Sequence, residues 1–273
     1  MNLTPKYNFE EFNRFLFEEV DLGLYQHKYL RNFINKVQQG KSTFYDLSVI
    51  NTNGDGWIMI IYGEMLLVYG YNWKTDQFQE IRKIFDLNKY TNYTLSGEDE
   101  LIDELMKFYN PKNYKIEKRR LFYKSGKIDL FKKENFRVEL GTLNQLDELA
   151  LMLQEYYHEE YSGLNDKDIE EMQNRMSSLI QTEKVYVLLN FDNKILSFCS
   201  IIDPDIGILF TKNEYRNTGY GKIILSYCSN FLQQRNGIVY LMTDRDKPES
   251  NRVCDKVGFK PYYNYKMIKI NCG

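Results

Sequence analysis

The segment from residue 206 to residue 235 constrains the fold of this chain more than any other. The run Ile206–Thr211 is rich in branched and aromatic residues, which is typical of a strand, and apolar residues recur at helical spacing after Gly219. The residues that join the two runs include Arg216-Asn217-Thr218-Gly219-Tyr220-Gly221, an Arg-x-x-Gly-x-Gly pattern. The segment therefore predicts a strand, a glycine-bearing turn and a helix from about Gly219 to Arg235.

Such a turn has chemical consequences. The first amides of a helix have no partner within the helix and lie at the positive end of its dipole, so they favour a phosphate or pyrophosphate group. Gly219 and Gly221 would let a ligand approach the backbone closely, and Arg216 could add a charge-assisted contact. Taken alone, the pattern is also compatible with an ordinary strand-to-helix turn that binds nothing.

The elements around this turn define the second half of the chain. Strands are predicted at residues 136–140, 184–190, 195–202, 206–211, 238–243 and 264–270, and helices at 144–161, 166–180, 219–235 and 248–257. Asp166 is the expected N-cap of the second of these helices. The resulting order is β-α-α-β-β-β-α-β-α-β.

The first half predicts a separate α+β unit. Apolar spacing favours amphipathic helices at 9–16 and 25–37, followed by an antiparallel meander of strands at 44–50, 57–62 and 65–69. Helices at 75–85 and 98–109 and a strand near 116–123 complete it. A length of 273 residues fits two domains at about 150 residues each. We place the first at residues 1–130 and the second at 131–273, with the boundary in a polar stretch.

The charge balance argues against a dedicated nucleic-acid binder, because the chain has 36 basic and 38 acidic residues and a net charge of -2. Residues 111–127 do carry seven basic residues and one acid. This stretch is interpreted either as a nucleic-acid patch or as the solvated face of a strand and linker, and the acidic balance of the whole chain favours the second interpretation.

Cysteine usage and hydropathy set further expectations. The four cysteines are widely spaced and form no Cys-x-x-Cys pair, so no metal site is predicted. The residues from Met1 to Glu19 do not resemble a signal peptide, and the apolar window Trp57–Tyr71 is too broken to span a bilayer. We expect a cytoplasmic protein with no membrane partner.

Two motifs in order make the second half similar to a known family. The turn at 216–221 and the later run Leu241–Phe259, with its Pro248, Asn251 and terminal Gly258-Phe259, resemble the GNAT superfamily of acyl-CoA-dependent N-acetyltransferases. The resemblance covers residues 136–270. It implies an α/β (α+β) GNAT fold, a mixed central sheet flanked by helices. The first domain then looks like a degenerate second GNAT-like domain without a cofactor site.

The resemblance implies acetyl-CoA as cosubstrate and a direct attack by the acceptor in a ternary complex. The acceptor would be a primary amine of a small molecule or peptide, and the protein a monomer or homodimer. The pantetheine arm would run between the strands at 206–211 and 238–243, where a bulge turns an amide toward the thioester carbonyl. The implied cofactor-binding residues are Leu209, Phe210, Thr211, Arg216, Asn217, Thr218, Gly219, Tyr220, Gly221, Lys222 and Asn251.

Two positions depart from the family pattern, and they keep a second hypothesis open. Lys247 stands where relatives carry Asn, and Cys254 stands where they carry the tyrosine that protonates the departing thiolate. The thiol of Cys254 is either that acid or a small packed residue. If it is only packed, the thiolate would leave without help from the protein. Cys254 and the absence of a clear general base also keep open the alternative of a non-catalytic GNAT-like module that binds acyl-CoA.

His158 is the candidate general base, because its helix would line the acceptor site and imidazole titrates in the required range. The alternative is an ordinary surface histidine. Residues 154–171 carry seven acids and one base, which could attract a cationic amine or form a solvated helix face.

Overall fold

The computed structural model describes residues 20–42, 44–52, 56–90, 92–111, 113–164 and 166–270, with residues 44–52 and 84 described by their backbone alone. The helix expected at 9–16 lies outside this part of the chain. The described residues divide into two compact units. The first contains the described residues from 20 to 122 together with 244–246 and 263–270. The second contains Tyr123–Thr243 and Lys247–Tyr262.

The first unit is an α+β sheet structure. Its elements in chain order are η1 (Tyr25–His27), α2 (Lys28–Gln38), β1 (Phe44–Thr52), β2 (Gly56–Gly63), β3 (Leu66–Tyr71), α3 (Gln77–Ile84), η2 (Leu87–Lys89), β4 (Thr94–Glu98), α4 (Asp99–Tyr109) and the first part of β5 (Tyr114–Ser125). The predicted antiparallel meander is present as β1, β2 and β3. Strand β4 was not predicted; it pairs in parallel with β3 and antiparallel with β11 (Phe259–Ile270).

Alternation along β2 explains how this sheet is covered. Ile58 and Ile60 belong to a buried cluster with residues of α3 and α4, so these helices cover one face. Met59 and Ile61 are equally buried but point to the other face, because side chains alternate along a strand. On the face opposite α3 and α4, His27 packs edge-on against Tyr69 of β3.

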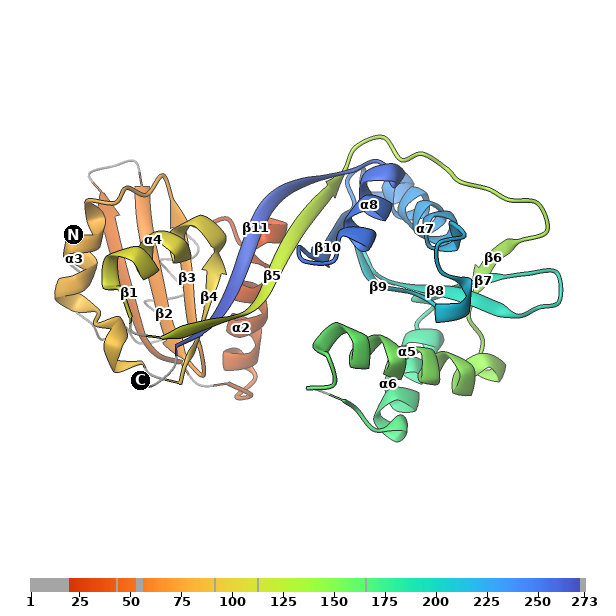
Figure 1. Ribbon diagram of the computed structural model, residues 1–273, viewed down its shortest axis with the longest axis horizontal. Coiled ribbons are helices and arrows are strands. Elements are labelled where there is room, and N and C mark those ends of the chain that lie inside the picture. Colours follow the sequence, from red (N-terminus) through yellow and green to blue (C-terminus); the bar gives the residue numbers. More distant parts are fainter. Residues whose placement is uncertain are drawn as a thin grey trace. The chain divides into compact units, whose positions relative to one another are not determined.

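The second unit holds the predicted element order. Its elements are β6 (Arg137–Leu140), η3 (Leu143–Gln145), α5 (Leu146–Tyr161), α6 (Ile169–Gln181), β7 (Val185–Leu189), β8 (Ile195–Ile202), β9 (Asp205–Thr211), η4 (Asn213–Tyr215), α7 (Tyr220–Asn236), β10 (Tyr240–Asp244), α8 (Pro248–Val257) and the first part of β11. The strands lie in the order β10-β9-β8-β7-β6 (Figure 1).

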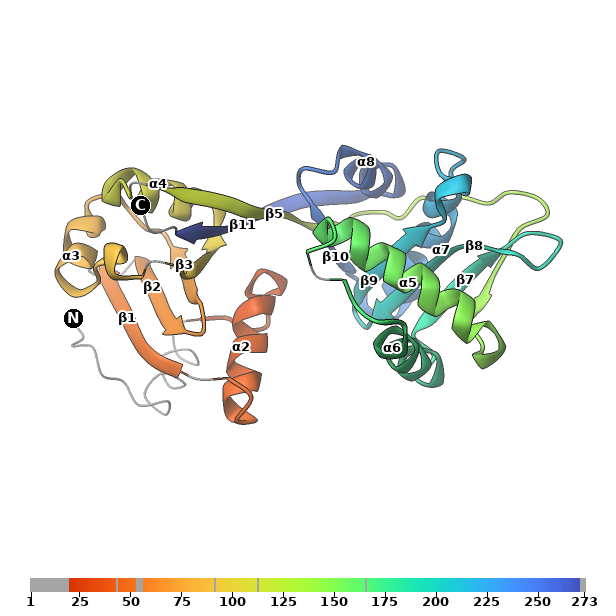
Figure 2. The same cartoon turned by 60° about the horizontal axis from the view of Figure 1, so that its bottom comes forward.

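Helices cover both faces of this second sheet. Val185 and Val187 of β7 are buried against α5 and α6, whereas Tyr186, between them, contacts the ring of Tyr227 on α7. Figure 2 shows the same layers, with α5 and α6 on one side of the strands and α7 on the other. Mixed strands flanked by helices confirm the predicted fold class.

Two sequence-based expectations need correction here. The first is the helix cap: α6 begins at Ile169, and Asp168 is its N-cap, because its carboxylate accepts the Glu171 amide at 2.7 Å. Asp166 lies before the cap and contacts His158 instead. The second is the division of the chain, because the structure returns residues 244–246 and 263–270 to the first unit and ends that unit's main segment at Phe122 rather than at residue 130.

The basic stretch at 111–127 is largely strand β5, and part of its charge is neutralised within the first unit. Lys118 Nζ lies 2.6 Å from the carboxylate of Asp244, and both side chains are nearly buried. Arg119 lies 3.5 Å from Asp246. Ion pairing of this kind favours the interpretation of the stretch as a structural strand over a nucleic-acid patch. In the part of the chain that the structure describes, no helix is long and apolar enough to cross a membrane.

Candidate functional site

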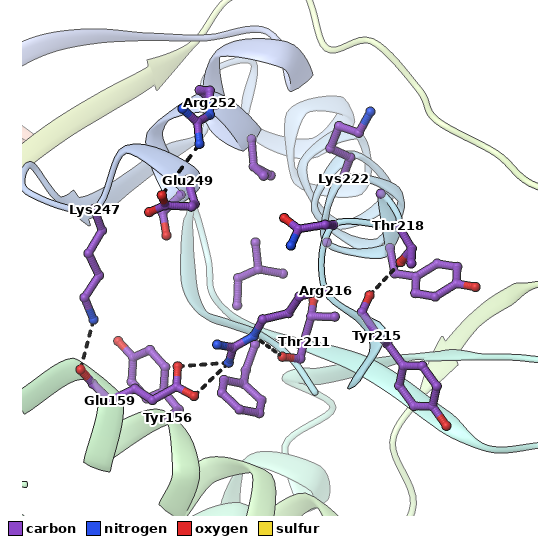
Figure 3. Close-up of a pocket in the computed structure, with 18 of the residues that line it drawn as sticks. Tyr156, Glu159, Thr211, Tyr215, Arg216, Thr218, Lys222, Lys247, Glu249 and Arg252 are labelled. Carbon is purple, nitrogen blue, oxygen red and sulfur yellow. Dashed lines mark hydrogen bonds and ion pairs between the residues drawn. The ribbon is translucent and has the colours of Figure 1, made fainter. Parts of the chain in front are cut away.

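A pocket of about 1100 Å³ opens in the second unit. Residues from the end of α5, the end of β9, the turn before α7 and helix α8 line it (Figure 3). The lining includes all the predicted cofactor-binding residues from 209 to 211 and from 216 to 222, together with His158. Asn251 and Cys254 do not line it.

Strand β9 presents backbone groups to this pocket. Its pairing with β8 moves from Cys199–Leu209 to Ile201–Ile206, so β9 has one extra residue there, which is a β-bulge. The amide of Ile208 donates to Ser200 Oγ at 2.7 Å and is therefore already used. The bulge predicted from the resemblance thus exists and lies directly before the pocket-lining residues.

In an antiparallel pair, successive residues alternately direct their backbone N–H and C=O groups toward and away from the partner strand. This alternation indicates which backbone groups of β9 face away from β8. Lys212 donates its amide to Leu196, and the carbonyl of Phe210 accepts from Ser197 Oγ at 2.7 Å. Residue 210 therefore turns its backbone toward β8, so its neighbours Leu209 and Thr211 turn theirs to the opposite side, where the pocket lies.

Strand β10 runs parallel to β9, and the two pair at Tyr240 and Asp205, near their N-terminal ends. The pocket-lining residues of β9 lie four to six positions further along the strand. The backbone groups of β9 that face away from β8 at Leu209 and Thr211 therefore line the pocket. An extended ligand could form hydrogen bonds with them, as a neighbouring strand would.

The turn before α7 has the backbone geometry of an anion site. Asn217 and Gly219 adopt positive φ values of 62° and 91°, and α7 begins at Tyr220. The Gly219 conformation favours a residue without Cβ. The amides of Gly219, Tyr220 and Gly221 precede the first intrahelical hydrogen bonds, which run from Lys222 and Ile223 to the Gly219 carbonyl.

Gly221 keeps the helix start close to β9. A Cβ built on it would lie 3.4 Å from Thr211 Oγ1, at the short end of ordinary contact. A larger side chain here would project toward the space between α7 and β9, which is pocket. Because Gly221 has no side chain, this space stays open.

Arg216 does not extend freely to this anion site. Its Nη2 donates to both carboxylate oxygens of Glu159 at 2.9 Å, and its Nε donates to the Thr211 carbonyl at 3.0 Å. The guanidinium also lies over the Phe210 ring, 5.2 Å from its centroid. This ion pair fixes the turn against α5, and the contact of Arg216 with phosphate stays a prediction.

Lysines supply the positive charge that remains at the start of α7. Lys222 Nζ lies 4.8 Å from the centroid of the Phe131 ring. Lys133 Nζ lies 5.1 Å from the centroids of Phe136 and Tyr220. Together with the amides that precede the first intrahelical hydrogen bonds, these ammonium groups make the region favourable for a phosphate group.

Cys254 is buried, with 3% of its surface exposed, and burial raises the pKa of its thiol to about 12. A thiol outside the pocket lining, with a pKa that high, is a poor donor to a leaving group in the pocket. The structure therefore favours the packing interpretation of this residue. Asn251, which also does not line the pocket, accepts a hydrogen bond from Thr243 Oγ1 at 2.6 Å.

His158 lies at the rim of the pocket with its side chain largely exposed. Its Nδ1 is 2.8 Å from a carboxylate oxygen of Asp166, a residue in the loop that leads to α6. When Nδ1 carries the proton that this contact needs, Nε2 is left as an acceptor. The histidine is thus oriented by a carboxylate.

Sequence reasoning missed the roles of three charged residues in this pocket. Glu159 holds Arg216, while Lys247 reaches from the start of α8 to the Glu159 carbonyl at 3.0 Å and to Glu160 Oε2 at 3.3 Å. The acidic excess of residues 154–171 was the available signal, but it did not identify which carboxylates turn inward. Among the described residues, no group of three or more His, Cys, Asp or Glu side chains could hold a metal ion.

Comparisons with known proteins identify similar sequences and folds. Residues 146–259 match the model of the Acetyltransferase (GNAT) family. A Drosophila protein shares the fold with a TM-score of 0.56 at 10% identity over 98% of each chain. A GNAT-family acetyltransferase from Colwellia psychrerythraea gives 0.54 at 11% identity over 91% of this chain and 96% of that one.

A third structure, a GCN5-related N-acetyltransferase from Sphaerobacter thermophilus, gives a TM-score of 0.50 at 12% identity, covering 82% of this chain and 83% of that chain. At these identities the likeness concerns the fold. No curated protein matches the chain by sequence.

Proposed function

We propose that this chain, whose residues 146–259 form a domain of the GNAT acetyltransferase family, moves the acetyl group of acetyl-CoA to a primary amine of a small molecule or peptide. The observation that carries the proposal is one pocket that combines the outward edge of β9 with the uncapped amides of α7. The first is suited to an extended amide chain and the second to a pyrophosphate, the two linked parts of coenzyme A.

The residues present fit this cosubstrate. The amides of Gly219, Tyr220 and Gly221 would hold the pyrophosphate, with Lys222 adding charge. Leu209 and Thr211 would bond the pantetheine arm through their backbone groups. Acetyl-CoA would supply the activated acetyl group. The protein would orient the thioester, stabilise the oxyanion and remove a proton from the acceptor.

Two groups are suited to the chemical step. The amide of Leu209 follows the bulge and faces away from β8, so it can donate to the thioester oxygen as negative charge develops there. His158, oriented by Asp166, can accept the amine proton through Nε2. The departing thiolate takes its proton from water, since Cys254 is buried.

The first unit is proposed to be a GNAT-like domain that binds no coenzyme A of its own. This proposal rests on its sequence, because residues 1–125 contain no Arg-x-x-Gly-x-Gly turn. Titration calorimetry should therefore find one acetyl-CoA site per chain, and a stoichiometry near two would contradict this part.

The activity is tested by screening a panel of primary amines with acetyl-CoA and measuring release of the free thiol. Release that depends on one amine class supports the proposal and identifies the acceptor. Tight binding of acetyl-CoA without thiol release from any amine would instead support a non-catalytic binding module.

A further inference from the structure

A lysine of the chain itself enters the pocket. Lys247 is the residue before α8, and its side chain extends to the end of α5, where Nζ donates to the Glu159 carbonyl at 3.0 Å and lies 3.3 Å from Glu160 Oε2 (Figure 3). The Glu160 side chain is 8% exposed and that of Lys247 39% exposed. A primary amine is therefore held at one place in the pocket by two acceptors.

Further contacts connect this amine to the strand that would hold the thioester arm. Glu159, whose carbonyl accepts from Lys247, also binds Arg216 with its carboxylate. Arg216 in turn donates to the carbonyl of Thr211 at the end of β9. The amine, the carboxylates and the β9 edge thus line one continuous pocket.

The two other lysines of the pocket lack this arrangement. Lys222 lies at the start of α7 against the Phe131 ring, and Lys256 lies in the last turn of α8. Within the described part of the chain, neither has a carboxylate within ion-pair distance. Lys247 alone among these three is paired with a nearly buried carboxylate, a group that can take a proton from it.

We propose that Lys247 is an acetylation site of the protein itself, with acetyl-CoA bound in the same pocket as the donor. The proposal rests on the function proposed above, since it needs the acetyl-CoA site. It assigns Lys247 as an internal acceptor amine and Glu160 as the group that receives its proton.

The step balances without any further reactant. The ammonium of Lys247 gives one proton to the Glu160 carboxylate, and the free electron pair on Nζ attacks the thioester carbonyl carbon. A C–N bond forms and the C–S bond breaks. The nitrogen loses its second proton as the amide forms, and the coenzyme A thiolate takes up one proton through water. The products are acetyl-Lys247 and free coenzyme A.

Acetylation would change the pocket. The neutral amide of acetyl-Lys247 could not form an ion pair with Glu160, which would leave a nearly buried carboxylate facing the pocket without that cation. An incoming cationic amine could then take its place.

The experiment incubates the full chain with acetyl-CoA in the absence of any added amine and follows acetylation by intact mass and peptide mapping. We expect one acetyl group on Lys247, added at least about tenfold faster than on Lys256, which serves as the internal reference in the same pocket. Lys247→Arg should abolish the modification. Glu160→Gln should slow it by about a hundredfold or more, the range of a lost proton acceptor.

Binding of acetyl-CoA is measured in parallel by calorimetry, so that the two proposals fail separately. If the chain binds acetyl-CoA and Lys247 is acetylated no faster than Lys256, the internal acceptor is refuted while the proposed function stands. If no acetyl-CoA binds, both proposals fall. Because the comparison is made within the wild-type chain, it does not depend on whether either variant folds.

Discussion

Replacing Gly221 by Glu would place a carboxylate where the proposed pyrophosphate meets the start of α7. Gly221 lies in the first turn of the helix, and a Cβ there already approaches Thr211 Oγ1 to 3.4 Å. The longer side chain cannot continue toward Thr211 without moving it, so it must occupy the pocket. The Glu side chain would therefore reduce the volume of the pocket and place a negative charge next to the anionic pyrophosphate.

The electrostatic part sets the expected size of the effect. Two unit charges about 4 Å apart at an effective dielectric near 20 repel by about 4 kcal/mol. That energy corresponds to about a thousandfold increase in Kd. Gly221→Ala is the matched control, because it adds only the Cβ and introduces no charge. Alanine favours a helix over glycine, by up to about 1 kcal/mol in a helix interior, so this control should melt no lower than the wild type.

The assay is titration calorimetry with acetyl-CoA, supported by thermal melting to show that each variant is folded. We expect near-complete loss of binding for Gly221→Glu and less than about a tenfold change for Gly221→Ala. A folded Gly221→Glu variant with the wild-type Kd would refute the assignment of the pyrophosphate to this turn. That result would not contradict the description of the fold.

Two further predictions follow from buried groups. Cys254→Ala should lower kcat by less than about tenfold, because the thiol is buried and its pKa is raised to about 12; a hundredfold loss in a folded variant that still binds acetyl-CoA would contradict this. Burial lowers the pKa of His27 below 6.5, so between the two values the unfolded chain binds more protons. The stability that the neutral imidazole contributes should be fully present above about pH 6.5 and decrease as the pH falls through this window. Denaturant unfolding at a series of pH values should show the decrease, and it should be smaller in His27→Gln; equal slopes in both proteins would show that His27 is not responsible.

Several elements were predictable because the signals that encode them are local. The turn from β9 to α7 was located to within about one residue, since Gly219 at positive φ, the last strand residue and the first helical turn lie within about a dozen positions. Element order followed from periodicity in the same way. Strand β4 was missed because Thr94–Glu98 contains Ser96 and Gly97 and only one branched aliphatic residue, Leu95, so its identity as a strand depends on its neighbours β3 and β11.

Side-chain partners could not be found this way. Arg216 binds Glu159, which is 57 residues earlier in the chain, and the sequence did not indicate this partner. Lys247 meets Glu160 across 87 residues, and Asp166 pairs with His158 rather than capping α6. Nothing in the local pattern around any of these residues indicates its partner.

The sequence by itself determined the order of the elements in the second unit and the position of the turn between β9 and α7. Backbone conformation and helix ends are governed by residues a few positions apart, and these can be compared along the chain. Only the tertiary structure decided which of seven acidic residues between 154 and 171 face the pocket and that the thiol of Cys254 is buried. Those outcomes depend on how α5 and α8 pack against the sheet, and the free energy of that packing is summed over many distant contacts.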